Sequence, residues 1–220
     1  MPRCWPTITF TSPSDARRGE PRAGRFASIV CGFALLAALL GACEQPATGP
    51  RFELTDISGA SFGKELSLPD FDGKNRSLAE FRGKVVTVFF GYTHCPDVCP
   101  VTLAEMAQVM RELGPDAARV QVLFVTVDPE RDSAEVLKQY VPAFDPAFLG
   151  LRGDADATAR VAKEFKVFYQ KQPLKDGGYT VDHSAGTYIF DGEGRLRLFA
   201  PYGRGAVAIL HDIRLLLAGG

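Results

Sequence analysis

Two cysteines, Cys95 and Cys99, lie in the stretch VFFGYTHCPDVCP (residues 88–100), directly after an apolar run. Each precedes a proline, a residue that is tolerated in the first turn of a helix. Helical positions i and i+4 have Cβ atoms about 5–6 Å apart, whereas a disulfide needs about 3.5–4.5 Å. The pair can therefore close to a disulfide after local adjustment, or stay open and bind one ion. A helix N-terminus favours the thiolate, which serves both chemistries.

A third group with suitable chemistry is His183, in the stretch VDHSAGTYIFD (residues 181–191). Two thiolates and an imidazole make a three-ligand metal site. Soft thiolates suit Cu(I), and imidazole suits copper or zinc. A Cys2His set with an open position is also a zinc pattern. At equal availability copper binds more tightly than zinc, so the residue types favour copper at Cys95, Cys99 and His183.

The elements that must position these residues alternate along the chain. The segments 84–90 and 119–128 are nearly continuous apolar runs, typical of buried strands. Gly177-Gly178 predicts a turn between strands. The predicted order is a short hairpin (52–68), then β-α-β-α, then β-β-α. The other predicted elements are helices at 101–113, from Asp132 or Ser133 to about Tyr140, at 154–167 and at 205–219, a brief strand or turn in FLGLRG, and strands in VFYQKQ, GYTVDHSAGTYIFD and GRLRLFAPYG.

This order indicates an α/β chain with a single thioredoxin-like domain, a mixed central sheet, flanking helices and an N-terminal β-hairpin extension. Such a fold brings the loop with the cysteines and the loop with His183 together at the carboxyl ends of the strands. Thioredoxin-type thiol enzymes usually carry a cis-proline before the strand that faces their cysteines. Residues 181–191 contain no proline, and the imidazole stands there instead.

The N-terminal part differs in composition from the rest. Residues 1–25 are basic and predicted to be disordered, and residues 26–43 contain no charge. A basic flank before an apolar run indicates an export signal. The run ends Leu-Gly-Ala-Cys at Cys43, which resembles a bacterial lipobox, with an uncleaved membrane anchor or an incidental cysteine as alternatives. We expect residues 44–51 to be a tether, residues 52–220 to be the folded domain, and the protein to be anchored on the periplasmic side of the bacterial cytoplasmic membrane through lipidated Cys43.

The motifs FFGYTHCPDVCP, VTVDPERDS and DHSAGTYIFD, in this order and spacing, resemble the Sco/SenC family over about residues 52–218. The resemblance implies a thioredoxin-like fold and an anchored N-terminus. It implies Cys95, Cys99 and His183 as ligands of copper. From the thiolates we expect Cu(I), and Cu(II) in addition. It further implies a role in assembling the CuA centre of cytochrome c oxidase, with the copper-bearing oxidase subunit as client and a periplasmic protein as upstream copper donor.

Several other polar residues lie near the motifs. His94 is adjacent to Cys95, so we expect it to act beside the ligands or in docking. Asp97 could tune the thiolates or contact a partner. Asp128 and Asp132 form a turn and a helix cap or border the site, and His211 is expected on a solvated helical face.

Two functions from different classes remain open. In the first, a metallochaperone holds copper and releases it by ligand exchange. In the second, a thiol–disulfide oxidoreductase reduces the target's cysteines, with Cys95 attacking and Cys99 resolving. A purely structural disulfide is disfavoured, because so short a loop gains little stability from closure. The net charge of −1 gives no basic surface for nucleic acid.

Overall fold

The computed structural model describes residues 51–175 and 177–219. The predicted leader, the signal segment with Cys43 and all but the last residue of the tether lie outside these residues. Within the described ranges, no helix has both the length and the apolar character needed to span a membrane.

A six-stranded mixed sheet with the strand order β1-β10-β9-β4-β5-β6 forms the centre of the domain. Strands β4, β5 and β6 are parallel to one another. Strand β9 is antiparallel to β4, and β10 is antiparallel to β9. Every residue of β4 and β5 is buried, which explains their continuous apolar sequences. The bounds are β1 Thr55–Asp56, β4 Val85–Gly91, β5 Val120–Thr126, β6 Leu149–Leu151, β9 Gly186–Phe190 and β10 Leu196–Pro201.

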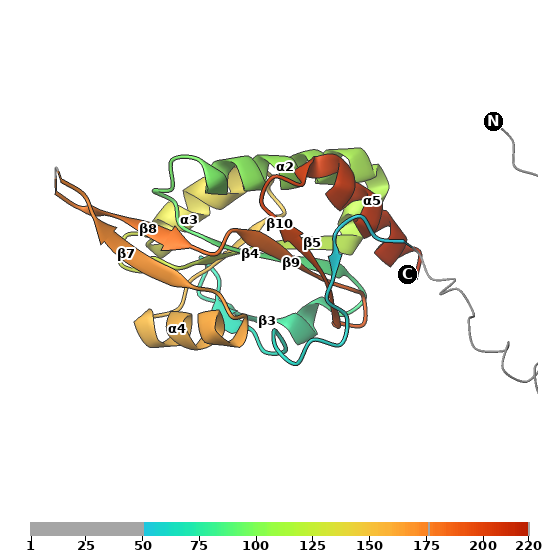
Figure 1. Ribbon diagram of the computed structural model, residues 1–220, viewed down its shortest axis with the longest axis horizontal. Helices are drawn as coiled ribbons and strands as arrows, with labels where there is room; N and C mark the ends of the chain where they lie inside the picture. Colours follow the sequence, from blue (N-terminus) through green and yellow to red (C-terminus); the bar gives the residue numbers. More distant parts are fainter. Residues whose placement is uncertain (1–50, 176, 220) are drawn as a thin grey trace, which may run out of the picture. The chain divides into compact units, whose positions relative to one another are not determined.

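Helices cover both faces of this sheet. Figure 1 shows α2, α3 and α5 along one face and α4 on the opposite face. The apolar side chains of the sheet and of the helices on its two faces form one cluster of buried residues, with Phe90, Phe124 and Phe165 among its fully buried members. This arrangement confirms the predicted fold class. The α-helices are α2 Val98–Leu113, α3 Ala134–Tyr140, α4 Ala155–Glu164 and α5 Gly205–Leu217, with 3-10 turns η1 Leu78–Phe81, η2 Gly114–Arg119 and η3 Val141–Ala143.

An N-terminal hairpin is present, but the prediction that residues 52–68 form it is wrong. Strand β1 pairs with β10 at the edge of the central sheet. The hairpin consists of β2 (Ser67–Pro69) and β3 (Asn75–Ser77). The carboxylate of Asp70 explains this, because it accepts the backbone N–H groups of Asp72 and Lys74 and so closes the turn.

A second hairpin, formed by β7 (Tyr169–Pro173) and β8 (Tyr179–His183), makes a separate two-stranded sheet. We call it the β7–β8 hairpin. It extends away from the central sheet in Figure 1. His183 is the last residue of β8 and pairs with Tyr169 at the base of this hairpin. The base therefore lies where the chain returns to the central sheet as β9.

Candidate metal centre

The cysteine pair lies where β4 gives way to α2, at the carboxyl end of a central parallel strand. Cys95 is half-buried in the loop, whereas Cys99 is fully buried in the first turn of α2. Strand β4 ends at Gly91. A Cβ atom there would lie 2.8 Å from the Cys99 sulfur and 2.9 Å from the ring of Phe124. Only glycine at this position leaves room for the buried sulfur.

Cys95, Cys99 and His183 converge although they come from separate segments. One ligand atom from each residue lies within 4.8 Å of the other two. The Cys99 Sγ is 3.6 Å from His183 Nε2. The backbone N–H of Cys99 donates to the Cys95 Sγ at 3.4 Å, and both cysteines are free thiols. The cysteine loop and the segment that carries His183 therefore lie together, as the sequence predicted.

The imidazole of His183 is held in one orientation by a hydrogen bond and by two ring contacts. Its Nδ1 lies 3.0 Å from the carbonyl oxygen of Ser184. A carbonyl can only accept, so Nδ1 donates to it, and Nε2 is the ring nitrogen that faces the sulfurs. The ring packs edge-on against Tyr92, at 5.8 Å between centroids, and against Phe89, at 6.2 Å. Histidines that bind metals are typically oriented in this way, by a hydrogen bond from the ring nitrogen that does not face the ion.

The two thiols differ in acidity. The pKa of Cys95 is lowered to about 5, first by the hydrogen bond from the Cys99 thiol and also by the backbone N–H groups of Asp97 and Cys99 and by His183, against the opposing effect of burial. The pKa of Cys99 is raised, because its proton is shared with Cys95 and because it is buried. At neutral pH Cys95 is therefore the thiolate, and Cys99 keeps its proton.

A buried carboxylate that the sequence did not identify as structural support fixes the cysteine loop. Asp132 accepts the backbone N–H of Thr93 at 3.0 Å and the hydroxyl of Thr93 at 2.6 Å. It also accepts the hydroxyl of Thr126 at 2.6 Å. Asp132 does not cap α3, since Ser133 does. The sequence indicated only that Asp132 follows a buried strand. It was predicted either to cap a helix or to border the site.

The residues next to Cys95, Cys99 and His183 have distinct surroundings. His94 is exposed, with its Nδ1 3.2 Å from the Thr93 hydroxyl, and it lines a surface groove of ≈ 540 Å³. It is not part of the three-ligand group. Asp97 is the exposed residue that precedes α2. Asp128 is fully buried and binds Arg131 and the hydroxyl of Tyr179, so it supports β8.

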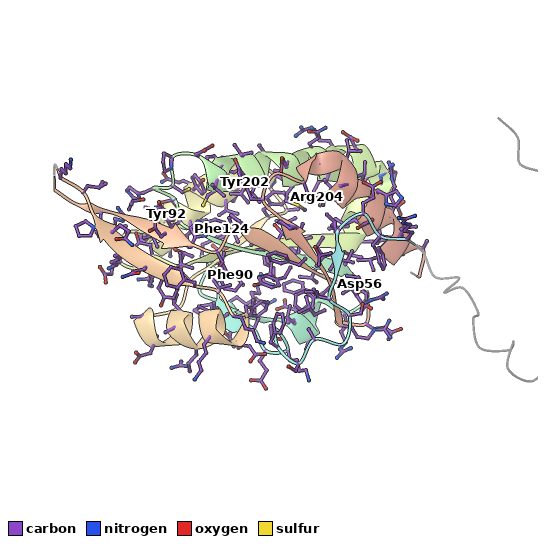
Figure 2. All side chains as sticks on the ribbon, viewed as in Figure 1. Asp56, Phe90, Tyr92, Phe124, Tyr202 and Arg204 are labelled. Atoms are coloured by element: carbon purple, nitrogen blue, oxygen red, sulfur yellow. The ribbon has the colours of Figure 1, made fainter. Side chains whose placement is uncertain are left out.

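His211 lies apart from this centre and is exposed on α5, as predicted. Its Nδ1 is 2.8 Å from Asp212, a buried carboxylate that accepts the backbone N–H groups of Glu53 and Leu54. Asp212 thus fastens the start of the described chain to α5. In Figure 2 the labelled Tyr92, the residue that follows β4, lies by the β7–β8 hairpin, where its hydroxyl is 2.8 Å from the Thr180 hydroxyl.

Comparisons with known proteins agree with this architecture. Residues 55–218 match the family model described as SCO1/SenC. The chain is 35% identical over 222 residues to the mitochondrial SCO2 homolog of Bos taurus, covering 95% of this chain and 84% of that one. It is 40% identical over 157 residues to the mitochondrial SCO2 homolog of Mus musculus, covering 70% of this chain and 62% of that one.

A solved structure agrees as well. The structure of ScoI from Bradyrhizobium japonicum with copper bound is similar at a TM-score of 0.65 and 40% identity, covering 70% of this chain and 98% of that one. With a family match over most of its length and this likeness in three dimensions, the chain belongs to the SCO1/SenC family.

Proposed function

We propose that this protein is a copper-binding metallochaperone that delivers copper to the CuA site of cytochrome c oxidase, with Cys95, Cys99 and His183 as the copper ligands. The observation that carries the proposal is the convergence of their ligand atoms within 4.8 Å. Three ligands at about 2.3 Å from one ion, the usual metal–sulfur distance, are about 4 Å apart in a trigonal arrangement. The Cys99 Sγ–His183 Nε2 distance of 3.6 Å, and the limit of 4.8 Å on all three separations, are compatible with that value.

The chemistry of the three residues suits reversible binding of Cu(I). Cys95 is already a thiolate at neutral pH, so it offers the first ligand without losing a proton. Cys99 must release its proton when the ion binds. His183 would bind the ion through Nε2, because its Nδ1 donates to the carbonyl oxygen of Ser184. A three-ligand site leaves a position open, through which a thiol or imidazole of the client can bind the ion before these ligands leave.

The second function that an observation favours is reduction of disulfides in the client. The lowered pKa of Cys95 makes it the attacking thiolate. Its sulfur would form a mixed disulfide with one client sulfur and release the other as a thiolate. Cys99 would then lose its proton and displace the second client sulfur, leaving the Cys95–Cys99 disulfide and two reduced client cysteines. Metal binding and thiol reduction share the cysteines but differ in their need for His183.

The two functions are separated by His183→Ala. We expect the full-length variant to bind Cu(I) far more weakly in competition with a chromophoric chelator, and to reduce a peptide disulfide at nearly the parental rate. Cys95→Ser should abolish both activities. His211→Ala, an exposed histidine outside the site, is the matched control and should change neither. Full copper affinity in His183→Ala would refute the ligand assignment.

We also propose that Cys43 is lipidated and anchors the domain on the periplasmic side of the membrane, where an upstream donor supplies its copper. The support is the uncharged run that ends in Leu-Gly-Ala-Cys. Mass spectrometry of the membrane-extracted protein should detect an acylated N-terminal Cys43. Cys43→Ser should release the protein from the membrane or leave the apolar run uncleaved. An unmodified Cys43 in the mature wild-type chain would refute this anchor.

A further inference from the structure

The position of His183 depends on contacts made by the β7–β8 hairpin. Its two strands are hydrogen-bonded to one another and belong to neither of the other described sheets. It projects from the central sheet (Figure 1), so the sheet ladder does not fix it. Side chains from other parts of the domain must therefore hold the strand that ends in His183.

The firmest of these contacts is made by Arg131, from the loop between β5 and α3. Its Nη1 donates to the carbonyl oxygen of Tyr179 at 2.8 Å, and its guanidinium carbon lies 3.7 Å from the centroid of the Tyr179 ring. The fully buried Asp128 accepts from Arg131 Nε and, at 2.8 Å, from the Tyr179 hydroxyl. We call Asp128, Arg131 and Tyr179 the β8 clasp. A planar guanidinium can make these contacts together, whereas an ammonium cannot.

Tyr92 connects the β8 clasp to the imidazole. Its hydroxyl lies 2.8 Å from the Thr180 hydroxyl and accepts the backbone N–H of Val181 at 3.4 Å. The Arg131 guanidinium carbon lies 5.7 Å from the centroid of the Tyr92 ring. The Tyr92 ring also contacts the imidazole of His183, with 5.8 Å between the ring centroids. A shift of β8 at Tyr179 is thus transmitted to His183 through both the strand and this ring.

The cysteine loop has supports of its own, and Tyr92, whose carbonyl oxygen accepts the N–H of Cys95 at 3.2 Å, also links it to the β8 clasp. Asp132 fixes Thr93, and α2 fixes Cys99. Arg131 makes no hydrogen bond to this loop among the described contacts. Loosening the β8 clasp should therefore move His183 more than the thiol pair, which Asp132 and α2 also hold.

We propose that Arg131 is a positioning residue that sets the place of His183 beside the two sulfurs and thereby the copper affinity, a role that rests on the ligand assignment proposed above. A ligand that is already held in place loses less conformational freedom when the ion binds. Residues that orient metal ligands in this way typically change metal affinity by about 10–100-fold when they are substituted.

The test is a double-mutant cycle on the full-length protein. Arg131→Lys keeps a cation beside Asp128 but loses the stacked, forked contact with Tyr179. We expect it to weaken Cu(I) binding by about 10–100-fold in chelator competition. In the His183→Ala background the same substitution should have no further effect, because the group it positions is gone. Arg76→Lys, which alters a similarly half-buried Arg pairing with the buried Asp70, is the matched control and should leave the affinity unchanged.

A readout without copper separates positioning from general destabilisation. In the apo protein, the Nδ1–H signal of His183 in a proton–nitrogen NMR spectrum should shift or broaden in Arg131→Lys and stay unchanged in Arg76→Lys. Tyr179→Phe removes one hydroxyl only, and should give a smaller change in the same direction. This variant provides the same test if Arg131→Lys does not fold.

The outcomes distinguish this proposal from the function itself. If His183→Ala keeps full copper affinity, the ligand assignment fails and the positioning role falls with it. If His183→Ala weakens binding but Arg131→Lys and Tyr179→Phe bind copper as tightly as the parent, the ligand assignment stands and the role of Arg131 is refuted. An Arg131→Lys effect that persists in the His183→Ala background also refutes it.

Discussion

Gly91→Ala is the substitution with the most direct consequence for the buried sulfur of the metal centre. The added Cβ would lie 2.8 Å from the Cys99 Sγ, 2.9 Å from Phe124 Cε2 and 2.9 Å from Phe89 Cε1. Ordinary contacts between carbon atoms are about 3.5–4.0 Å long, so each of these is too short by roughly 0.6 Å or more. Both rings and the sulfur are buried in the core and have little space into which to move.

Overpacking of this kind typically costs about 1–3 kcal/mol. For a domain of this size, that corresponds to a fall in the melting temperature of between about 2 and 12 °C. The sulfur is the atom at the start of α2 that the new methyl group pushes away, so Cu(I) affinity should fall as well. The assays are thermal unfolding of the reduced, copper-free protein and chelator competition for Cu(I).

Gly192→Ala is the control for this experiment. Its added Cβ would have no neighbour closer than 3.7 Å, an ordinary contact, and its backbone is not in the left-handed region. We expect its melting temperature and copper affinity to match those of the parent. If Gly91→Ala also matched the parent in both assays, the argument that the glycine makes room for Cys99 would be refuted.

Three further predictions concern the thiols and their support. Alkylation by iodoacetamide should modify Cys95 first, at a rate that falls as pH drops through about 5, because its thiolate is protonated below its pKa; a midpoint near 9 would contradict this. Loading with Cu(I) at pH 7 should release about one proton, from Cys99, as measured by calorimetry in buffers of different ionisation enthalpy, and two would show that Cys95 is also protonated. Asp132→Ala should lower the free energy of unfolding by about 1–3 kcal/mol, because it leaves the hydroxyl donors of Thr93 and Thr126 without an acceptor. An unchanged midpoint of urea unfolding would show that Asp132 does not stabilise the cysteine loop.

Much of the architecture could be predicted from the sequence because buried parallel strands and soft metal ligands have distinctive residue types. The apolar runs of β4 and β5 could hardly be anything but central strands, and their position in the sheet decides where the cysteine loop emerges. The approach of His183 to that loop followed from the order of the elements. Each of these predictions depended on composition and chain order alone.

The supports of the site could not be predicted in this way, because they depend on side-chain direction. In the sequence, Asp128 and Asp132 both follow a buried strand and both suit a turn or a helix cap. In the structure, Asp132 turns toward Thr93 and Asp128 toward Tyr179. The hairpin prediction failed for a related reason, since the bonds from Asp70 to Asp72 and Lys74 decide where the chain turns. The alternation of apolar and polar residues along a segment does not reveal hydrogen bonds between a side chain and the backbone, such as those of Asp70.

The opposite environments of the two cysteines explain how one pair can serve both metal binding and redox chemistry. Cys99 is buried at the start of α2 under the close approach of Gly91, so its sulfur has little freedom. Cys95 lies half-exposed in the loop before that helix. A disulfide requires the sulfurs to approach to about 2.05 Å, whereas an ion is held with its ligands about 4 Å apart. Formation of the disulfide must therefore come mainly from movement of Cys95. This movement takes the Cys95 sulfur, the proposed first ligand, away from His183. The extra residue between the cysteines, relative to the two-residue spacing of thioredoxin-type motifs, gives the loop the length for both positions.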